Sequence, residues 1–155
     1  MKLKNYIGWN DFLGCHVAER ILSYVFKAVQ RMPHGNIGFD FICNKGYKID
    51  SKASCLHKNN TYDFNIKYNK IADYFLLIGF DNKENLNPQH IWLIKGDEII
   101  NGYRKLNDYQ ELVITNKLCC LENYAKYELI DKLNETINCC SNLKLERVRK
   151  SWNFC

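Results

Sequence analysis

Three charged side chains of residues 38–52 are spaced so that they could act together on a divalent cation. The segment predicts two strands joined by the turn 44–46, because three-residue hairpin loops favour glycine in third place. Counting back along both strands places Asp40 opposite Asp50, with Cβ atoms about 4.5–5.5 Å apart. Lys52 lies two residues beyond Asp50 and is therefore expected on the same face. Two carboxylates beside a lysine suit Mg²⁺-dependent cleavage of a phosphodiester.

Each of these groups has a defined place in that chemistry. Mg²⁺ binds hard oxygen ligands, often one or two carboxylates plus substrate phosphate, so Asp40, Asp50 and the Ser51 carbonyl are the candidate ligands. Mn²⁺ is expected to substitute for Mg²⁺. Lys52 would orient the attacking water or neutralise the developing oxyanion. The alternative interpretation is that these residues are solvated groups on an exposed hairpin.

The elements around the hairpin indicate an α/β fold. Apolar residues recur at three- and four-residue steps over residues 11–30, which predicts an amphipathic helix. Residues 62–68 alternate as a strand with one exposed face does, and the continuous apolar run 74–80 predicts a central strand buried on both sides. Further strands are expected at 90–94 and 112–115, and a second long helix at 121–137. This order predicts a central mixed β-sheet flanked by helices.

Composition limits the class of protein. The 155 residues suit one domain, with a core over about residues 10–140 and a basic tail over about 141–155. No apolar run is long enough to span a membrane, and no signal peptide is recognisable, so we expect a cytoplasmic protein. The net charge of +5 helps binding to a polyanion without identifying one. The eight cysteines contain no C-x-x-C pair and are interpreted as reduced, mostly buried residues.

With these motifs in this order, the chain resembles the PD-(D/E)XK nuclease superfamily. That restriction-endonuclease-like core begins with a helix that carries a glutamate. A strand with an aspartate and an antiparallel neighbour with (D/E)-x-K follow. Asp40 matches the single aspartate, with Phe39 in place of the usual proline, and residues 50–52 match (D/E)-x-K. Glu19 is similar to the helix glutamate of archaeal Holliday-junction resolvases, and the resemblance implies that it joins the metal ligands as a catalytic residue.

The resemblance implies an Mg²⁺-dependent DNA endonuclease. Residues 67–77 and 90–94 look like those of small phage- or intron-associated endonucleases, so a homing or mobile-element enzyme is the first hypothesis. A Holliday-junction resolvase and a restriction-type enzyme are the alternatives, and a non-catalytic DNA-binding protein on the same scaffold is an alternative of another class. Cutting both strands of duplex or branched DNA takes two active sites, which predicts a homodimer or a higher even oligomer.

Basic residues near the hairpin are candidates for contacts with DNA phosphates. An ordinary hydrated sheet face is the alternative interpretation for most of them. The candidates are Lys45, Lys48, Lys58, Lys67, Lys70, His34 and Arg104.

Overall fold

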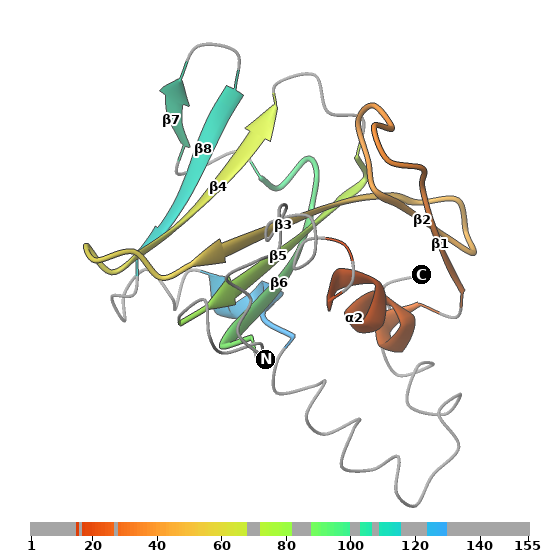
Figure 1. Cartoon of the computed structure of the whole chain (residues 1–155), viewed down its shortest axis with the longest axis horizontal. Helices are drawn as coiled ribbons and strands as arrows, with labels where there is room; N and C mark the ends of the chain where they lie inside the picture. Colours follow the sequence, from red (N-terminus) through yellow and green to blue (C-terminus); the bar gives the residue numbers. More distant parts are fainter. Residues whose placement is uncertain are drawn as a thin grey trace, which may run out of the picture.

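A computed structural model describes residues 15, 17–26, 28–67, 72–81, 88–99, 103–106, 109–115 and 124–129. Within them the chain is an α/β protein built on a mixed five-stranded sheet (Figure 1). The strand order is β1-β2-β3-β5-β6, in which β3 pairs parallel with β5 and the other neighbours pair antiparallel. The strands are β1 (Val29–Arg31), β2 (Phe41–Cys43), β3 (Lys48–Cys55), β5 (Tyr74–Phe80) and β6 (His90–Lys95).

Three further strands form a separate antiparallel sheet in the order β4-β8-β7. They are β4 (Thr61–Lys67), β7 (Tyr103–Leu106) and β8 (Tyr109–Thr115). The sequence predicts the strands at β4, β6 and part of β8, but it predicts one sheet. The structure corrects this to two sheets, since β4 pairs with β8 and not with its sequence neighbours β3 and β5.

The five-stranded sheet is covered differently on its two faces (Figure 1). Helix α2 (Ala18–Val25) packs on one face, and its buried residues follow the i, i+3, i+4, i+7 spacing of an amphipathic helix. β4 packs on the other face through every second residue, namely Tyr62, Phe64 and Ile66. All seven residues of β5 are buried, as predicted for a strand covered on both sides.

Close packing on the β4 face depends on a glycine in β5. A Cβ atom at Gly79 would lie 3.0 Å from Cε1 of Tyr62, whose side chain is fully buried. The absence of a side chain at Gly79 therefore lets the Tyr62 ring lie flat against the sheet.

Two predicted helices differ from the structure. The helix expected over 11–30 ends at Val25, where Phe26 is extended, and Val29–Arg31 forms edge strand β1 instead. β-branched residues at this end of the pattern suit a strand as well as a helix, and pairing with β2 decides between them. The helix expected over 121–137 is also interrupted. Residues Ala125–Tyr127 form a single 3-10 turn, η3, and the next residue, Glu128, bridges to Trp92 of β6.

The predicted hairpin is present between β2 and β3. Gly46 has φ +81°, and its N–H donates to the Cys43 carbonyl at 2.9 Å, as the predicted three-residue loop requires. The pairs Phe41–Ile49 and Ile42–Lys48 confirm the predicted register. The segments 1–14 and 141–155, which contain the predicted start of the first helix and the basic tail, lie outside the described residues.

Candidate metal and phosphodiester site

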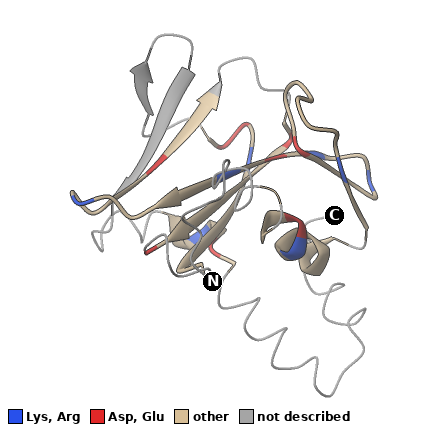
Figure 2. Cartoon of the chain, in the orientation of Figure 1, with Lys and Arg blue, Asp and Glu red and all other residues tan. Residues whose placement is uncertain are grey.

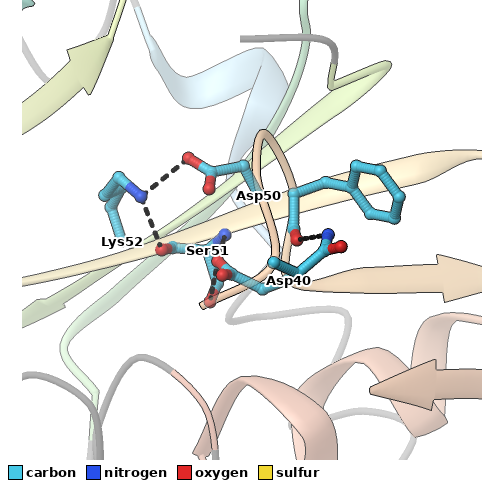
Figure 3. Close-up of polar contacts among 6 residues, drawn as sticks. Asp40, Asp50, Ser51 and Lys52 are labelled. Atoms are coloured by element: carbon cyan, nitrogen blue, oxygen red, sulfur yellow. Dashed lines mark hydrogen bonds and ion pairs between the residues drawn. The ribbon is translucent and has the colours of Figure 1, made fainter. Parts of the chain in front are cut away.

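Asp40 binds the peptide of Ser51 from across the hairpin. Its Oδ2 accepts a hydrogen bond from the Ser51 N–H at 2.8 Å and another from the Ser51 hydroxyl at 3.2 Å (Figure 3). Asp40 itself precedes β2, and its own N–H donates to the Ile49 carbonyl at 2.9 Å. Beyond the end of the β2–β3 ladder, the Asp40 carboxylate thus accepts the hydrogen bond of a β3 N–H.

Asp50 and Lys52 form an ion pair on the same strand. Lys52 Nζ lies 2.8 Å from Asp50 Oδ2 and donates to the Ser51 carbonyl at 3.3 Å (Figure 3). The Asp50 side chain is fully buried, whereas 25% of the Lys52 side chain is exposed. The lysine ammonium therefore lies between two of the three oxygens that the sequence predicts as metal ligands.

The predicted pairing of Asp40 with Asp50 on one face is corrected by the structure. Ile49 and Ala53 pack in the core on the α2 side, so the alternation of β3 places Asp50 and Lys52 on the opposite face and Ser51 on the α2 side. The ladder between β2 and β3 ends at Phe41–Ile49. The N–H of Asp40 also donates to the Ile49 carbonyl, so the strand has a bulge at this point. As a result, the Asp40 carboxylate lies beside Ser51 and not beside Asp50 as predicted.

Despite this shift, the backbone of one residue, Ser51, links all the candidate groups. The N–H and C=O of a residue in a strand point to the same edge, as the paired bonds of an antiparallel ladder show. The Ser51 N–H contacts Asp40 at that edge, and the Ser51 C=O contacts Lys52, which in turn contacts Asp50. The Asp40 carboxylate and the Lys52 ammonium thus contact the backbone of Ser51, and the Asp50 carboxylate contacts the ammonium.

Glu19 is not joined to this group. It lies on α2, half-buried, and its side chain makes no hydrogen bond or ion pair with the described residues. α2 also covers the face opposite to the one that carries Asp50 and Lys52. In the described part of the chain, no group of three or more His, Cys, Asp or Glu side chains could hold a metal ion. A cation here would thus depend on two carboxylates and the Ser51 carbonyl.

Two of the candidate DNA-binding residues that the structure describes, Lys45 and Lys58, lie far apart. Lys45 is exposed in the turn before β3, and Lys58 is exposed after its other end (Figure 2). Eight residues of extended strand separate them, which is about 26 Å. Lys48 Nζ lies 5.4 Å from the centre of the Phe39 ring, and His34 is exposed in the loop before Asp40.

Three of the candidates are described only in part or not at all. Lys67 pairs with Tyr109 at the end of β4, and Arg104 of β7 pairs with Glu111 of β8. Lys70 lies outside the described residues.

A second polar group, which the sequence reasoning missed, lies at the start of β6. Glu128 Oε2 lies 2.9 Å from His90 Nδ1, and Glu128 Oε1 accepts the Ile91 N–H at 2.6 Å. The His90 ring stacks on Trp92 with centroids 5.0 Å apart. No local motif joins His90 to a residue 38 positions later, so periodicity alone could not find this contact.

Comparisons with known proteins do not classify the chain. A scan against protein-family models finds no matching family, and a search of curated proteins finds no relative. Among the helices of the described residues, none has the length and apolar character needed to cross a bilayer.

Proposed function

We propose that this protein is a metal-dependent DNA endonuclease with the PD-(D/E)XK arrangement. The order of elements supports the proposal: helix α2 with Glu19, then Asp40 directly before β2, then antiparallel β3 with Asp50 and Lys52. The observation that carries it is the position of the Lys52 ammonium, which bridges the buried Asp50 carboxylate and the Ser51 carbonyl.

The donor atoms are of the kind that a hard divalent cation such as Mg²⁺ or Mn²⁺ binds. Asp40, Asp50 and the Ser51 carbonyl supply oxygen only, and Mg²⁺ is commonly held by one or two carboxylates while it keeps several waters. A cation already lies between two of these oxygens, in the form of the lysine ammonium. When bound, the metal would lower the pKa of a coordinated water and neutralise charge on the phosphoryl group.

The chain's own residues then have separate tasks. The Lys52 ammonium, displaced from Asp50, would donate a hydrogen bond to the attacking water or to a phosphoryl oxygen. Asp40 accepts the hydrogen bond of the Ser51 N–H and so holds the backbone on the N-terminal side of the Ser51 carbonyl. Asp50 is held in the sheet by β3 and its parallel neighbour β5, so its carboxylate has a defined position.

The proposed cellular role is that of a homing or mobile-element endonuclease, with junction resolution and restriction as the other roles of the same chemistry. One chain supplies one site, so cleavage of both strands requires an even number of protomers. The proposed substrate is double-stranded or branched DNA.

Cleavage of supercoiled plasmid tests the proposal. We expect nicking by the wild type with MgCl₂ or MnCl₂ and none with EDTA. Asp50→Asn and Lys52→Met should lower the rate at least about a hundredfold, the scale of losing a positioned electrostatic or acid–base group. Lys95→Met is the matched control, because Lys95 is exposed at the far end of β6, and it should cleave like the wild type.

Two results would overturn the assignment. Equal cleavage by the wild type and Lys52→Met would remove Lys52 from the chemistry. DNA binding by the wild type without cleavage in any divalent metal would favour a non-catalytic DNA-binding protein.

A further inference from the structure

The loop between β1 and β2, residues 32–40, presents an apolar side chain to solvent directly before the candidate site. Ile37 is 87% exposed. Among the described residues one other large apolar side chain is exposed, Tyr47 at 36%, and its ring packs edge-on against Tyr74 with centroids 5.4 Å apart. Ile37 therefore has the least cover of any large apolar side chain in the described part of the chain.

Hydrogen bonds hold the turn around Ile37 in shape. The Asn36 N–H donates to the Pro33 carbonyl at 3.1 Å, and Asn36 Nδ2 donates to the Phe39 carbonyl at 2.7 Å. Ile37 lies between the two ends of the second bond. These hydrogen bonds restrict the backbone on both sides of Ile37, which lowers the backbone entropy to be lost when Ile37 enters a binding partner.

The backbone of the loop is also closed at its base. Gly35 and Gly38 have φ +84° and +99°, the left-handed conformations that glycine adopts without strain. The Met32 N–H donates to the Asp40 carbonyl at 2.8 Å, so the residue that closes the loop is also the residue whose carboxylate binds Ser51.

The charge of the loop suits a polyanion. Residues 28–39 contain no Asp or Glu. Arg31 precedes the loop, exposed His34 lies within it, and the Lys48 ammonium lies over the Phe39 ring at 5.4 Å. An exposed apolar tip with basic neighbours matches the side chains that proteins insert between base steps.

We propose that Ile37 is a wedge that inserts into the base stack of the bound duplex, beside the proposed cleavage site at Asp40. The inference rests on the proposed nuclease function and adds to it a residue that deforms the substrate. Ile37 and Asp40 are three residues apart, a span of at most about 10 Å. This Cα–Cα span corresponds to about three base-pair rises, and the two side chains extend it, so the unstacked step is expected within a few base pairs of the cleaved bond.

Unwinding of closed circular plasmid tests the wedge without knowledge of a target sequence. The full chain is bound to relaxed plasmid in EDTA, which blocks the proposed cleavage, and topoisomerase I then resets the linking number. Wild type should change the linking number, Ile37→Leu should retain the change, and Ile37→Ser should lose most of it. On a 30-base-pair labelled duplex, Ile37→Ser should bind about tenfold more weakly, because the apolar burial is lost.

The outcomes separate the two proposals. If the wild type neither binds duplex DNA nor cleaves it, both are overturned. If wild type binds and cleaves but Ile37→Ser unwinds plasmid equally, the wedge alone is overturned. A change in sedimentation with unchanged unwinding would also overturn it, because Ile37 would then contact a second copy of the chain. Equal thermal midpoints of the three proteins establish that the exposed substitutions leave the fold intact.

Discussion

Removing the ammonium group of Lys52 should destabilise the protein when divalent cations are absent. Lys52 Nζ lies 2.8 Å from Oδ2 of Asp50, whose side chain is fully buried. Breaking a buried ion pair by removing one partner costs about 3–5 kcal/mol, because a buried charge loses its compensation. A quarter of the Lys52 side chain is exposed, so we expect the lower end, about 3 kcal/mol, for Lys52→Met. Methionine keeps the length of the apolar stem and removes the charge.

Divalent cations should reverse much of this loss. Without the ammonium, a metal ion that binds the Asp50 carboxylate and the Ser51 carbonyl in the native state no longer competes with Lys52 for these oxygens. A ligand present at about a hundred times its Kd stabilises the native state by about 2.7 kcal/mol. We therefore expect MgCl₂ to stabilise Lys52→Met more than it stabilises the wild type, in which the metal must displace the ammonium.

Urea unfolding followed by tryptophan fluorescence measures both effects. Each protein is unfolded in EDTA and again in MgCl₂, and Lys95→Met serves as the control for loss of a lysine charge. Lys95 is exposed, so its substitution should change the free energy of unfolding by less than about 0.5 kcal/mol. If Lys52→Met is as stable as the wild type in EDTA, the ion pair does not compensate Asp50. If Mg²⁺ has the same effect on both, these oxygens do not hold a divalent cation.

Two further predictions concern the polar contacts on the β4 and β6 side of the sheet. Glu128→Ala should lower the free energy of unfolding by about 2–3 kcal/mol, because the Ile91 N–H and His90 Nδ1 lose their acceptor. Urea unfolding measures this, and Glu128→Gln, which keeps an acceptor for Ile91, should lose less; equal losses would contradict it. Burial, and then the charge of Asp81, raise the pKa of Tyr62 from 10.0 to about 12. The native state thus favours the neutral phenol, and stability present below pH 10 is lost as pH rises through 12. Wild type should lose about 2 kcal/mol relative to Tyr62→Phe between pH 9.5 and 11.5, and parallel profiles would refute this.

The elements with strong local signals could be predicted from the sequence. Gly46 fixed the hairpin, since the turn type depends on the left-handed conformation of one residue. The apolar run of β5 predicted a strand covered on both faces, and the structure confirms it. In both cases the signal lies within a few residues of the feature that it determines.

The features that depend on long-range pairing could not be predicted in the same way. Apolar periodicity over 121–137 favours a helix, but Glu128 bridges to Trp92, and the Leu129 N–H donates to the Ile91 carbonyl at 2.7 Å. The outer edge of β6 offers these hydrogen bonds, and local periodicity contains no information on an edge that lies 37 residues away. Val29–Arg31 differs from the predicted helix for the same reason, because it pairs as a strand with the edge of β2.

The shift at Asp40 changes what the candidate site depends on. If Asp40 paired directly with Asp50, the geometry of the site would depend only on these two side chains, and the register of the hairpin would set the distance between them. In the structure both charged groups meet at the backbone of Ser51, with Asp40 on the N–H and Lys52 on the C=O. β3 pairs along its length with β5, and its residue Ile49 is buried in the core on the α2 face, so the backbone at Ser51 is held by the sheet. Asp40 instead belongs to the end of the 32–40 loop, which contains Ile37. If both proposals hold, the strand would position the Asp50 carboxylate and the Ser51 carbonyl, and the loop would connect the proposed deformation of the substrate to the position of the Asp40 carboxylate. The unwinding and stability experiments address these two parts separately.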